Sequence, residues 1–352
     1  MKQKRVRIIK EDGTEVDAVA PVILSASRAT DIPAFYSEWF FNRLERGYCR
    51  WRNPFNGADS YVAFKDVRFI VFWSKDPRPL VHYIDRLEEK GIGCYIQYTL
   101  NDYEEESLEP GVPPLAQRIE TFKMLVDKLG KGNVIWRFDP MILTDKISID
   151  NLLEKVRNIG NQLQDYTEKL VFSFADIASY RKVKSNLEKS GINYIEWNEA
   201  LITEFARKLS VMNRDCGWNF KLATCGEKIN LDQFGIQHNR CIDDELITHI
   251  SWQDKLLMDH LGMKIKTPTP CLFGNAEIPD KAIILDDRHY ALRTRNNRDL
   301  GQRKFCGCIS AKDIGQYNTC PHGCVYCYAN TTTDSAIRSF NRHNPLSETI
   351  IK

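Results

Sequence analysis

Short runs of β-branched and aromatic residues alternate with helical patterns, and this alternation limits the possible folds more than any other feature of the chain. The strand-like runs occupy residues 21–27, 67–75, 94–100, 133–142, 170–176 and 220–225. Each is almost continuously apolar, which is typical of a parallel strand buried on both faces. The segments between them show helical periodicity, and most end at Gly or Asn, as helix C-termini do.

This alternation predicts an α/β protein in which right-handed crossovers join the strands of a parallel sheet. We expect a parallel (β/α) TIM-like partial barrel, with a doubly wound open sheet as the alternative. In both architectures the carboxyl ends of the strands face the ligand. The strand-like runs end in the polar segments SASRATD, FWSKDP, YTLND, WRFDP, SFAD and ATCGEK, which therefore form the candidate site.

The periodic pattern weakens after about residue 260, where Pro-rich, basic and cysteine-rich segments follow one another. We therefore expect an α/β body over residues 1–260 and a C-terminal segment over 261–352 that returns to it. A formal net charge of +2 gives no general preference for nucleic acid or membranes. No apolar stretch is long enough to span a bilayer or to act as a signal peptide, so we expect a cytoplasmic protein without membrane contact.

The 11 cysteines are an unusual number for a reduced compartment, where metal or cluster ligation explains them better than disulfides do. Cys320, Cys324 and Cys327 have the spacing C-x-x-x-C-x-x-C near the end of the chain. Three thiolates on a short loop suit a 4Fe-4S cluster with one open iron. A structural zinc is the alternative, although it needs a fourth ligand such as His322.

The segment CPHGCVYCY, residues 320–328, resembles the cluster loop of radical S-adenosylmethionine (SAM) enzymes, with Tyr326 as the aromatic residue before the third cysteine. The resemblance implies that the open iron binds SAM and that the reduced cluster cleaves it to a 5′-deoxyadenosyl radical. It also implies an electron donor such as flavodoxin or ferredoxin. The whole chain resembles an uncharacterised bacterial family of unknown function that carries similar C-terminal cysteines.

The cysteine loop lies after the last strand-like run, whereas radical SAM enzymes carry it after the first strand. A circular permutation would reconcile the two orders if a segment near CISAKDI, residues 308–314, supplied a strand beside residues 21–27. SASRATD resembles a strand end that spore photoproduct lyase and its relatives place near the SAM amino group. The Glu-, Pro- and Arg-containing stretch 108–142 also resembles those enzymes.

Polar residues at the strand ends are the candidate cofactor-binding groups: Ser25, Ser27, Arg28, Asp31, Lys75, Arg137, Asp139, Ser173 and Tyr326. A guanidinium pairs with a carboxylate and a carboxylate accepts from an ammonium group, as a zwitterionic ligand requires. Helix or turn capping by Asp31 and Ser173 is the alternative. For Lys75, Arg137 and Asp139 the alternative is a ring of salt bridges at the mouth of the barrel.

A second set of thiols could hold an auxiliary iron–sulfur cluster or zinc: Cys225, Cys241, Cys306 and Cys308. The alternative is that they are small buried residues, as free cysteines often are. We interpret the remaining cysteines as structural: Cys49, Cys94, Cys216 and Cys271.

The expected function is that of a radical SAM-type enzyme which abstracts hydrogen from an unidentified substrate. Nucleic acid or a nucleotide is among the candidates because basic residues and Tyr290 share the stretch 288–304. One alternative is a non-catalytic TIM-like protein with a structural zinc or cluster, and another is a metal-independent hydrolase that uses Asp139 and Asp176.

Overall fold

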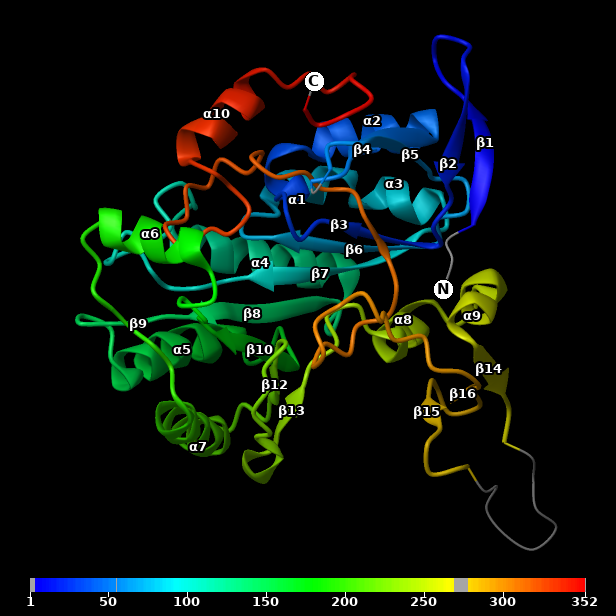
Figure 1. The fold of residues 1–352 in the computed structure, drawn as a ribbon. Coiled ribbons are helices and arrows are strands. Elements are labelled where there is room, and N and C mark those ends of the chain that lie inside the picture. Colours follow the sequence, from blue (N-terminus) through cyan, green and yellow to red (C-terminus); the bar gives the residue numbers. More distant parts are fainter. Residues whose placement is uncertain (1–3, 55, 269–277, 352) are drawn as a thin grey trace, which may run out of the picture.

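The computed structural model describes residues 4–54, 56–268 and 278–351, and an eight-stranded parallel sheet forms its centre (Figure 1). Across the sheet the strand order is β13-β12-β10-β8-β7-β6-β3-β17. The strands are β3 (Ile23–Ala26), β6 (Phe69–Ser74), β7 (Gly93–Thr99), β8 (Val134–Met141), β10 (Lys169–Phe174), β12 (Lys221–Thr224), β13 (Ile236–His238) and β17 (Lys312–Asp313). The predicted parallel α/β architecture is confirmed, and among the described strands β13 and β17 form the two edges of this sheet.

Helices follow the strands as the alternating pattern predicts: α1 (Ile32–Phe35), α2 (Ser37–Arg46), α3 (Ile84–Glu89), α4 (Leu115–Leu129), α5 (Ile149–Leu163), α6 (Arg181–Lys189) and α7 (Glu199–Asp215). A 3-10 helix, η1 (Arg78–Tyr83), precedes α3, and a second, η2 (Asp232–Phe234), precedes β13. Helix α5 begins with a capping box between Ser148 and Asn151, and the side chain of Asn198 caps α7. These caps bind backbone N–H groups that have no partner within the first helical turn.

Successive side chains of the central strands point to opposite faces of the sheet, and both faces are covered. In β6, Ile70 and Phe72 belong to the larger apolar core, which also contains the buried faces of α2, α4, α5 and α7. Phe69 and Val71 belong to a smaller core on the other face, with residues of α8 (Asp244–Ser251) and α9 (Lys255–Leu261). Burial on both faces explains why the strand-like runs are almost continuously apolar.

The C-terminal segment adds a strand beside β3, as the permutation hypothesis predicts for residues 308–314. Strand β17 pairs in parallel with β3, with Lys312 opposite Leu24 and Asp313 opposite Ser25. From β17 to β13 the strands therefore follow chain order, except that the first in space is the last in sequence. In Figure 1 the orange and red parts of the chain return to the blue N-terminal elements.

The Asp313 carboxylate fastens this junction. It accepts hydrogen bonds from Ser25 Oγ at 2.8 Å, from Ser27 Oγ at 2.7 Å and from the backbone N–H of Arg28 at 3.0 Å. Gly315 allows the close approach, because a Cβ atom there would lie 1.8 Å from Ser27 Oγ. The end of the sequence is thus built into the end of β3.

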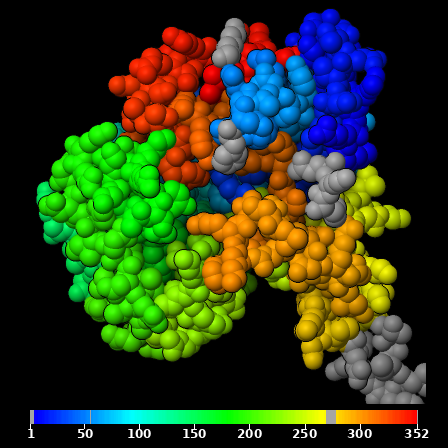
Figure 2. Space-filling view, viewed as in Figure 1, coloured from blue at the N-terminus to red at the C-terminus, as the bar shows by residue number. Residues whose placement is uncertain are grey.

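The last helix, α10 (Thr333–Asn341), extends the same attachment over α1 and α2. The rings of Phe340 and Phe35 lie 5.5 Å apart, and Trp39 Nε1 donates to Ser347 O at 2.9 Å. Figure 2 shows the red C-terminal residues directly beside the blue ones on the surface.

Three smaller sheets were not predicted from the sequence. One contains β1 (Arg5–Ile9), β2 (Glu15–Val19), β5 (Asp59–Ala63) and β4 (Tyr48–Arg52), and another contains β14 (Met263–Lys266), β16 (Tyr290–Arg293) and β15 (Ile283–Ile284). The third pairs β9 (Leu143–Thr144) with β11 (Tyr194–Ile195). Much of β1 and β2 is exposed, so their apolar signal is weak. Within the described residues, no helix is long and apolar enough to cross a membrane.

The Asp313 contacts predict that the junction contributes measurably to stability. Asp313→Ala leaves the buried Ser25 and Ser27 hydroxyls and the Arg28 N–H without their acceptor, so the free energy of unfolding should fall by about 3 kcal/mol. Urea titration followed by circular dichroism measures this change. Asp287→Ala, which removes an exposed carboxylate, is the matched control and should change stability little. Equal stability of the two variants would contradict this role.

Candidate functional site

The cysteine loop, residues 318–330, lies against the carboxyl ends of the first strands of the sheet. On one side Tyr36 Oη donates to Thr319 O at 2.6 Å, and the backbone N–H of Asp31 hydrogen-bonds the Cys320 thiol. On the other side, Val325 N donates to Leu108 O at 2.9 Å. The loop is therefore held between the segment after β3 and the segment that links β7 to α4. The circular permutation proposed from the sequence requires that Cys320 lie near the segment SASRATD, residues 25–31.

Gly111 completes the second attachment. Its N–H donates to His322 O at 2.8 Å, and a Cβ atom at this position would lie 2.6 Å from the same oxygen. A side chain would therefore push the cysteine loop away from the strand ends.

The three thiols of the loop are half-buried and lie close enough to influence one another. Burial raises the pKa of Cys320 to about 12, with contributions from the charges of Asp31 and Cys327. Burial also raises the pKa of Cys324, while the Lys75 ammonium opposes the increase. Among the residues that the structure describes, no group of three or more His, Cys, Asp or Glu side chains is positioned to hold a metal ion. The three thiols of the cysteine loop are thus close together, but their side chains are not arranged around a common point as metal ligands would be.

Asp31 joins the strand end to the cysteine loop. Its Oδ1 accepts from Ala34 N at 3.0 Å, which caps α1, and from Ser74 Oγ at 2.6 Å. Its Oδ2 accepts from Lys75 N at 2.7 Å and contacts His322 Nε2 at 2.8 Å. Burial acts to raise the pKa of Asp31, but its bonds to His322 and Ser74 outweigh burial and lower it. Both oxygens are occupied, so capping and anchoring describe Asp31 in this structure.

His322 is occupied in the same way, because its Nδ1 contacts Gly111 O at 3.2 Å. With Nε2 on Asp31 and Nδ1 on a carbonyl, the imidazole links the two sides of the cysteine loop. The fourth-ligand role considered for zinc would require these contacts to break.

Lys75, Glu109 and Tyr326 form a buried network beneath the loop. Lys75 Nζ lies 2.7 Å from Glu109 Oε1 and 3.0 Å from Tyr326 Oη, and Tyr326 Oη also donates to Glu109. Asn101 Nδ2 donates to the same Glu109 oxygen at 2.9 Å. Burial favours protonation of Glu109, but the charges of Lys75 and Arg118 lower its pKa to about 2. The network fixes the aromatic residue that precedes Cys327.

Arg137, Asp139 and Ser173 form a second network at the ends of β8 and β10. Arg137 Nη2 and Ser173 Oγ both donate to the Asp139 carboxylate, and Arg137 Nη1 donates to Gln97 Oε1 at 3.0 Å. These contacts match the ring of salt bridges named as the alternative. Asp176, the other carboxylate named for the hydrolase alternative, is exposed and accepts a turn contact from Ser179 N at 3.4 Å.

Among the predicted cofactor-binding residues, Arg28 has a cationic side chain whose N–H donors can still bind a ligand. The hydroxyls of Ser25 and Ser27 are bound to Asp313, whereas the Arg28 guanidinium packs 5.2 Å from the Trp73 ring centre. Arg137 lies 5.3 Å from the same ring, so two cations share one indole. The structure records no hydrogen bond from the Arg28 guanidinium to a described residue.

The second set of thiols also converges, beyond the ends of β12 and β13. Cys225 Sγ and Cys241 Sγ lie 3.3 Å apart, and Cys308 Sγ accepts from the backbone N–H of Cys241 at 3.2 Å. Of the cysteines interpreted as structural, Cys49 and Cys94 are buried and Cys216 is half-buried. Cys271 lies outside the described residues.

Several arginines of the basic stretch have structural contacts. Arg293 bonds Asp244 and Glu245 at 2.8 Å each, and Arg298 Nε donates to Cys306 O at 2.9 Å. These bonds attach the small β14–β16 sheet to α8 and shape the loop around Cys306. Nothing in these contacts supports a nucleic-acid surface.

The sequence analysis did not name five site residues individually, although the segments YTLND, ATCGEK and CISAKDI contain three of them: Asn101, Glu227 and Asp313. The other two are Gln97 and Glu109. Glu227 accepts from Phe174 N at 3.0 Å, and burial raises its pKa to about 7. Gln97 and Asp313 lie within strands, and Asn101 and Glu227 follow strand ends. Polarity in or just after an apolar run was therefore the available signal for four of them. Glu109 lies in a loop, where only the resemblance of residues 108–142 pointed to it.

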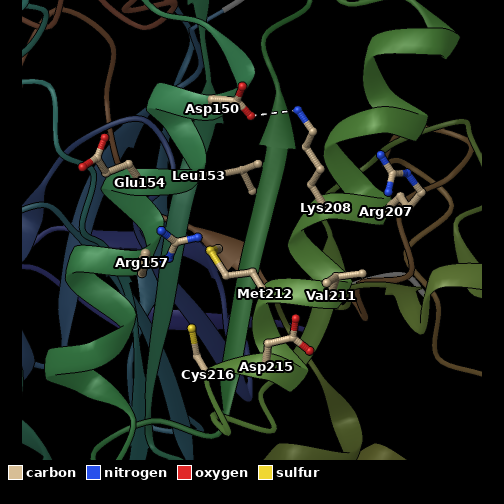
Figure 3. Close-up of a pocket in the computed structure, with 10 residues that line it drawn as sticks. All are labelled: Asp150, Leu153, Glu154, Arg157, Arg207, Lys208, Val211, Met212, Asp215 and Cys216. Atoms are coloured by element: carbon tan, nitrogen blue, oxygen red, sulfur yellow. Dashed lines mark hydrogen bonds and ion pairs between the residues drawn. The ribbon is translucent and has the colours of Figure 1, made fainter.

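A groove between α5 and α7 lies on the outer helical layer (Figure 3). Asp150 and Lys208 form an ion pair across it at 2.8 Å, with Glu154, Arg157, Arg207 and Asp215 around it. None of its lining residues belongs to the strand-end networks, so it is separate from the candidate site.

The Glu109 network predicts a specific pH dependence of stability. The carboxylate has a folded pKa of about 2, so its contribution, on the order of 3 kcal/mol, is complete above the unfolded pKa near 4.5 and is lost as pH falls towards 2. Glu109→Gln should therefore be destabilised most at neutral pH, and the difference from the unaltered protein should shrink below pH 4.5. Urea titrations of the apoprotein between pH 3 and 7 measure this. Exposed Glu105→Gln is the control, and a pH-independent difference would contradict the assignment.

Comparisons with known proteins give a family and no characterised relative. A search of curated proteins finds no match, and a search of solved structures finds none. The model of one protein family matches residues 23–329, which run from β3 through the cysteine loop and so include the complete strand-end site. The chain belongs to the family described as a domain of unknown function (DUF1848).

Proposed function

We propose that this protein is a radical SAM-type enzyme in which Cys320, Cys324 and Cys327 hold a 4Fe-4S cluster at the carboxyl ends of the sheet. The observation that carries the proposal is the position of the cysteine loop. It is attached to the strand end after β3 by Asp31 and Tyr36, although almost 300 residues separate them in sequence. The α/β unit would then be a partial barrel in which β17 takes the place of the first strand.

The residues around the loop fit such a cluster. Three soft thiolate ligands leave one iron of four without a protein ligand, and the loop is fastened at both sides by backbone hydrogen bonds. The Lys75 ammonium lies near Cys324 and favours its thiolate form. When bound and reduced, the cluster supplies the electron that cleaves SAM.

The protein's own groups would bind and orient SAM. The Arg28 guanidinium can pair with the SAM carboxylate, because its contact with Trp73 leaves N–H donors available. Asp139 and Ser173, at the ends of adjacent strands, can present oxygen atoms to a ribose or to the substrate. Asp31, His322, Glu109 and Tyr326 act as positioning residues, since they hold the loop and each other.

The charges at the strand ends favour an anionic substrate. Arg28, Arg137 and Arg303 lie on this face, where Asp139 pairs with Arg137 and the Asp313 carboxylate is bound by Ser25 and Ser27. Positive charge therefore exceeds negative charge among these groups. A nucleotide is one member of this class. The enzyme would have to place one C–H bond of the substrate beside the SAM 5′ carbon and exclude water.

The proposal predicts a redox-active cluster that depends on the three loop cysteines. After anaerobic reconstitution with iron and sulfide, dithionite and SAM should yield 5′-deoxyadenosine, measured by liquid chromatography. Cys320→Ala, Cys324→Ala and Cys327→Ala should each abolish this product, whereas Cys216→Ser should retain it. Failure of a fully clustered protein to release 5′-deoxyadenosine would refute the enzymatic proposal. Bound zinc without iron or sulfide would favour a structural zinc site.

The proposed role of Arg28 predicts weaker SAM binding when its charge is removed. A charge-assisted hydrogen bond contributes about 1.5–3 kcal/mol, so Arg28→Ala should raise the Kd for SAM by about 10- to 150-fold. Equilibrium dialysis of the reconstituted protein measures the change. Arg181→Ala removes an exposed arginine on α6 and should leave the Kd unchanged. An unaltered Kd in Arg28→Ala would exclude this contact.

A further inference from the structure

We propose that Cys225, Cys241, Cys306 and Cys308 form a second, all-thiolate metal centre that is independent of the cysteine loop. Its ligand chemistry is that of a thiophilic metal, either zinc or iron in an iron–sulfur cluster. This proposal concerns a different set of residues from the proposed function and does not depend on it.

The four thiols come from distant parts of the chain and meet at one place. Cys225 directly follows β12, and Cys241 lies between β13 and α8. Cys306 and Cys308 come from the segment that leads to β17, where Ile309 N donates to Ile242 O at 3.0 Å. The same return of the C-terminal segment that places the cysteine loop therefore brings the last two thiols to the first two.

The sulfur atoms are in mutual contact. Cys225 Sγ lies 3.3 Å from Cys241 Sγ, and Cys241 and Ile242 donate backbone N–H groups to Cys308 Sγ at 3.2 and 3.4 Å. The side chain of Cys308 also contacts the thiols of Cys241 and Cys306. The thiols form a row, so ligation of one ion would require side-chain rotation to surround it.

Positive charge surrounds this row. Arg137 Nη1 donates to Cys241 Sγ at 3.1 Å, and the charges of Arg28 and Arg303 act on the same group of sulfurs. Asn239 Nδ2 also donates to Cys241 Sγ at 3.1 Å. Buried cations are costly unless anions compensate them; Asp139 pairs with Arg137, and neutral thiols would add no further negative charge for Arg28 and Arg303. A metal centre with four thiolates carries net negative charge and matches these neighbours.

Two glycines make room for this arrangement. A Cβ atom at Gly226 would lie 2.8 Å from Arg303 Nη2, and one at Gly307 would lie 2.8 Å from Arg240 Cγ. They follow Cys225 and Cys306 directly, so the backbone beside both thiols is packed against arginine side chains. Cysteines that merely fill apolar space would not account for a guanidinium and an amide that both donate to Cys241 Sγ.

The test uses a variant that lacks the cysteine loop thiols, Cys320→Ala/Cys324→Ala/Cys327→Ala, so that only the second set can bind. Titration with Co²⁺ should give the intense visible bands of a tetrahedral thiolate site, with about one ion per chain. Adding Cys225→Ser and Cys308→Ser should weaken Co²⁺ binding by at least about 100-fold. Adding Cys216→Ser in their place is the matched control and should leave binding unchanged.

Two further measurements identify the metal and guard against misfolding. Metal and sulfide analysis of the loop-deficient variant, purified anaerobically, should show either zinc alone or iron with sulfide. Alkylation followed by mass spectrometry should show that the bound metal protects these four cysteines and leaves Cys216 reactive, while circular dichroism checks the fold. A folded variant that binds no metal after zinc or iron–sulfide reconstitution would overturn the proposal, as would a Cys225–Cys241 disulfide in the anaerobic protein. The two proposals can fail separately. If the second set of thiols binds metal but the unaltered protein forms no 5′-deoxyadenosine, the second metal centre stands and the proposed enzymatic function is refuted.

Discussion

The pairing of β17 with β3 is the interaction on which the rest of the structure depends. Two residues of β17 contact β3, and the Asp313 carboxylate then binds two hydroxyls and a backbone N–H at the end of that strand. This short contact fixes the path of the chain on both sides of it. Residues before β17 carry Cys306 and Cys308 to the ends of β12 and β13, and residues after it carry the cysteine loop to the ends of β3 and β7. Two groups of thiols are therefore positioned by one junction.

Electrostatic balance distinguishes these two groups. Under the cysteine loop, the Lys75 ammonium is neutralised by Glu109, and Tyr326 and Asn101 complete the network around the carboxylate. Around the second set, Arg137 bonds a thiol as well as Asp139, and Arg28 shares the Trp73 ring with Arg137 but has no carboxylate bound to its guanidinium among the described residues. Trp73 thus contacts two guanidiniums at the strand-end face. Such a surface suits anionic groups, whether thiolate–metal centres, the SAM carboxylate or a substrate.

Local patterns predicted the central architecture because burial on both faces leaves a clear apolar signature. The run at 133–142 became β8, and the helical segment between it and the run at 170–176 became α5. The sheets around β1 and β14 escaped prediction because exposed strands alternate weakly and their partners are distant in sequence. Strand β17 is only two residues long, so its apolar content could not reveal it. The permutation hypothesis pointed to this strand from the order of the motifs along the chain and not from local apolar content.

Site residues were predictable by type and less so by role. Asp31 was identified from its strand-end position, yet its contacts cap α1, bind the end of β6 and hold the cysteine loop. The last of these contacts is to His322, which is 291 residues away. Ser25 and Ser27 likewise serve the junction with Asp313. Convergence of the second thiols could not be deduced from spacing, because the pairing of β12 with β13 and of β17 with β3 brings these distant segments together. Long-range closure, which local sequence does not encode, decides these roles.

The most direct test of the central claim is electron paramagnetic resonance of the reduced protein with and without SAM, in a Cys225→Ser/Cys308→Ser variant that isolates the cysteine loop. The account predicts the signal of a reduced 4Fe-4S cluster and a change in that signal when SAM is added, because the open iron gains a ligand. A protein that binds no iron, or a cluster signal that SAM does not alter, would contradict the account.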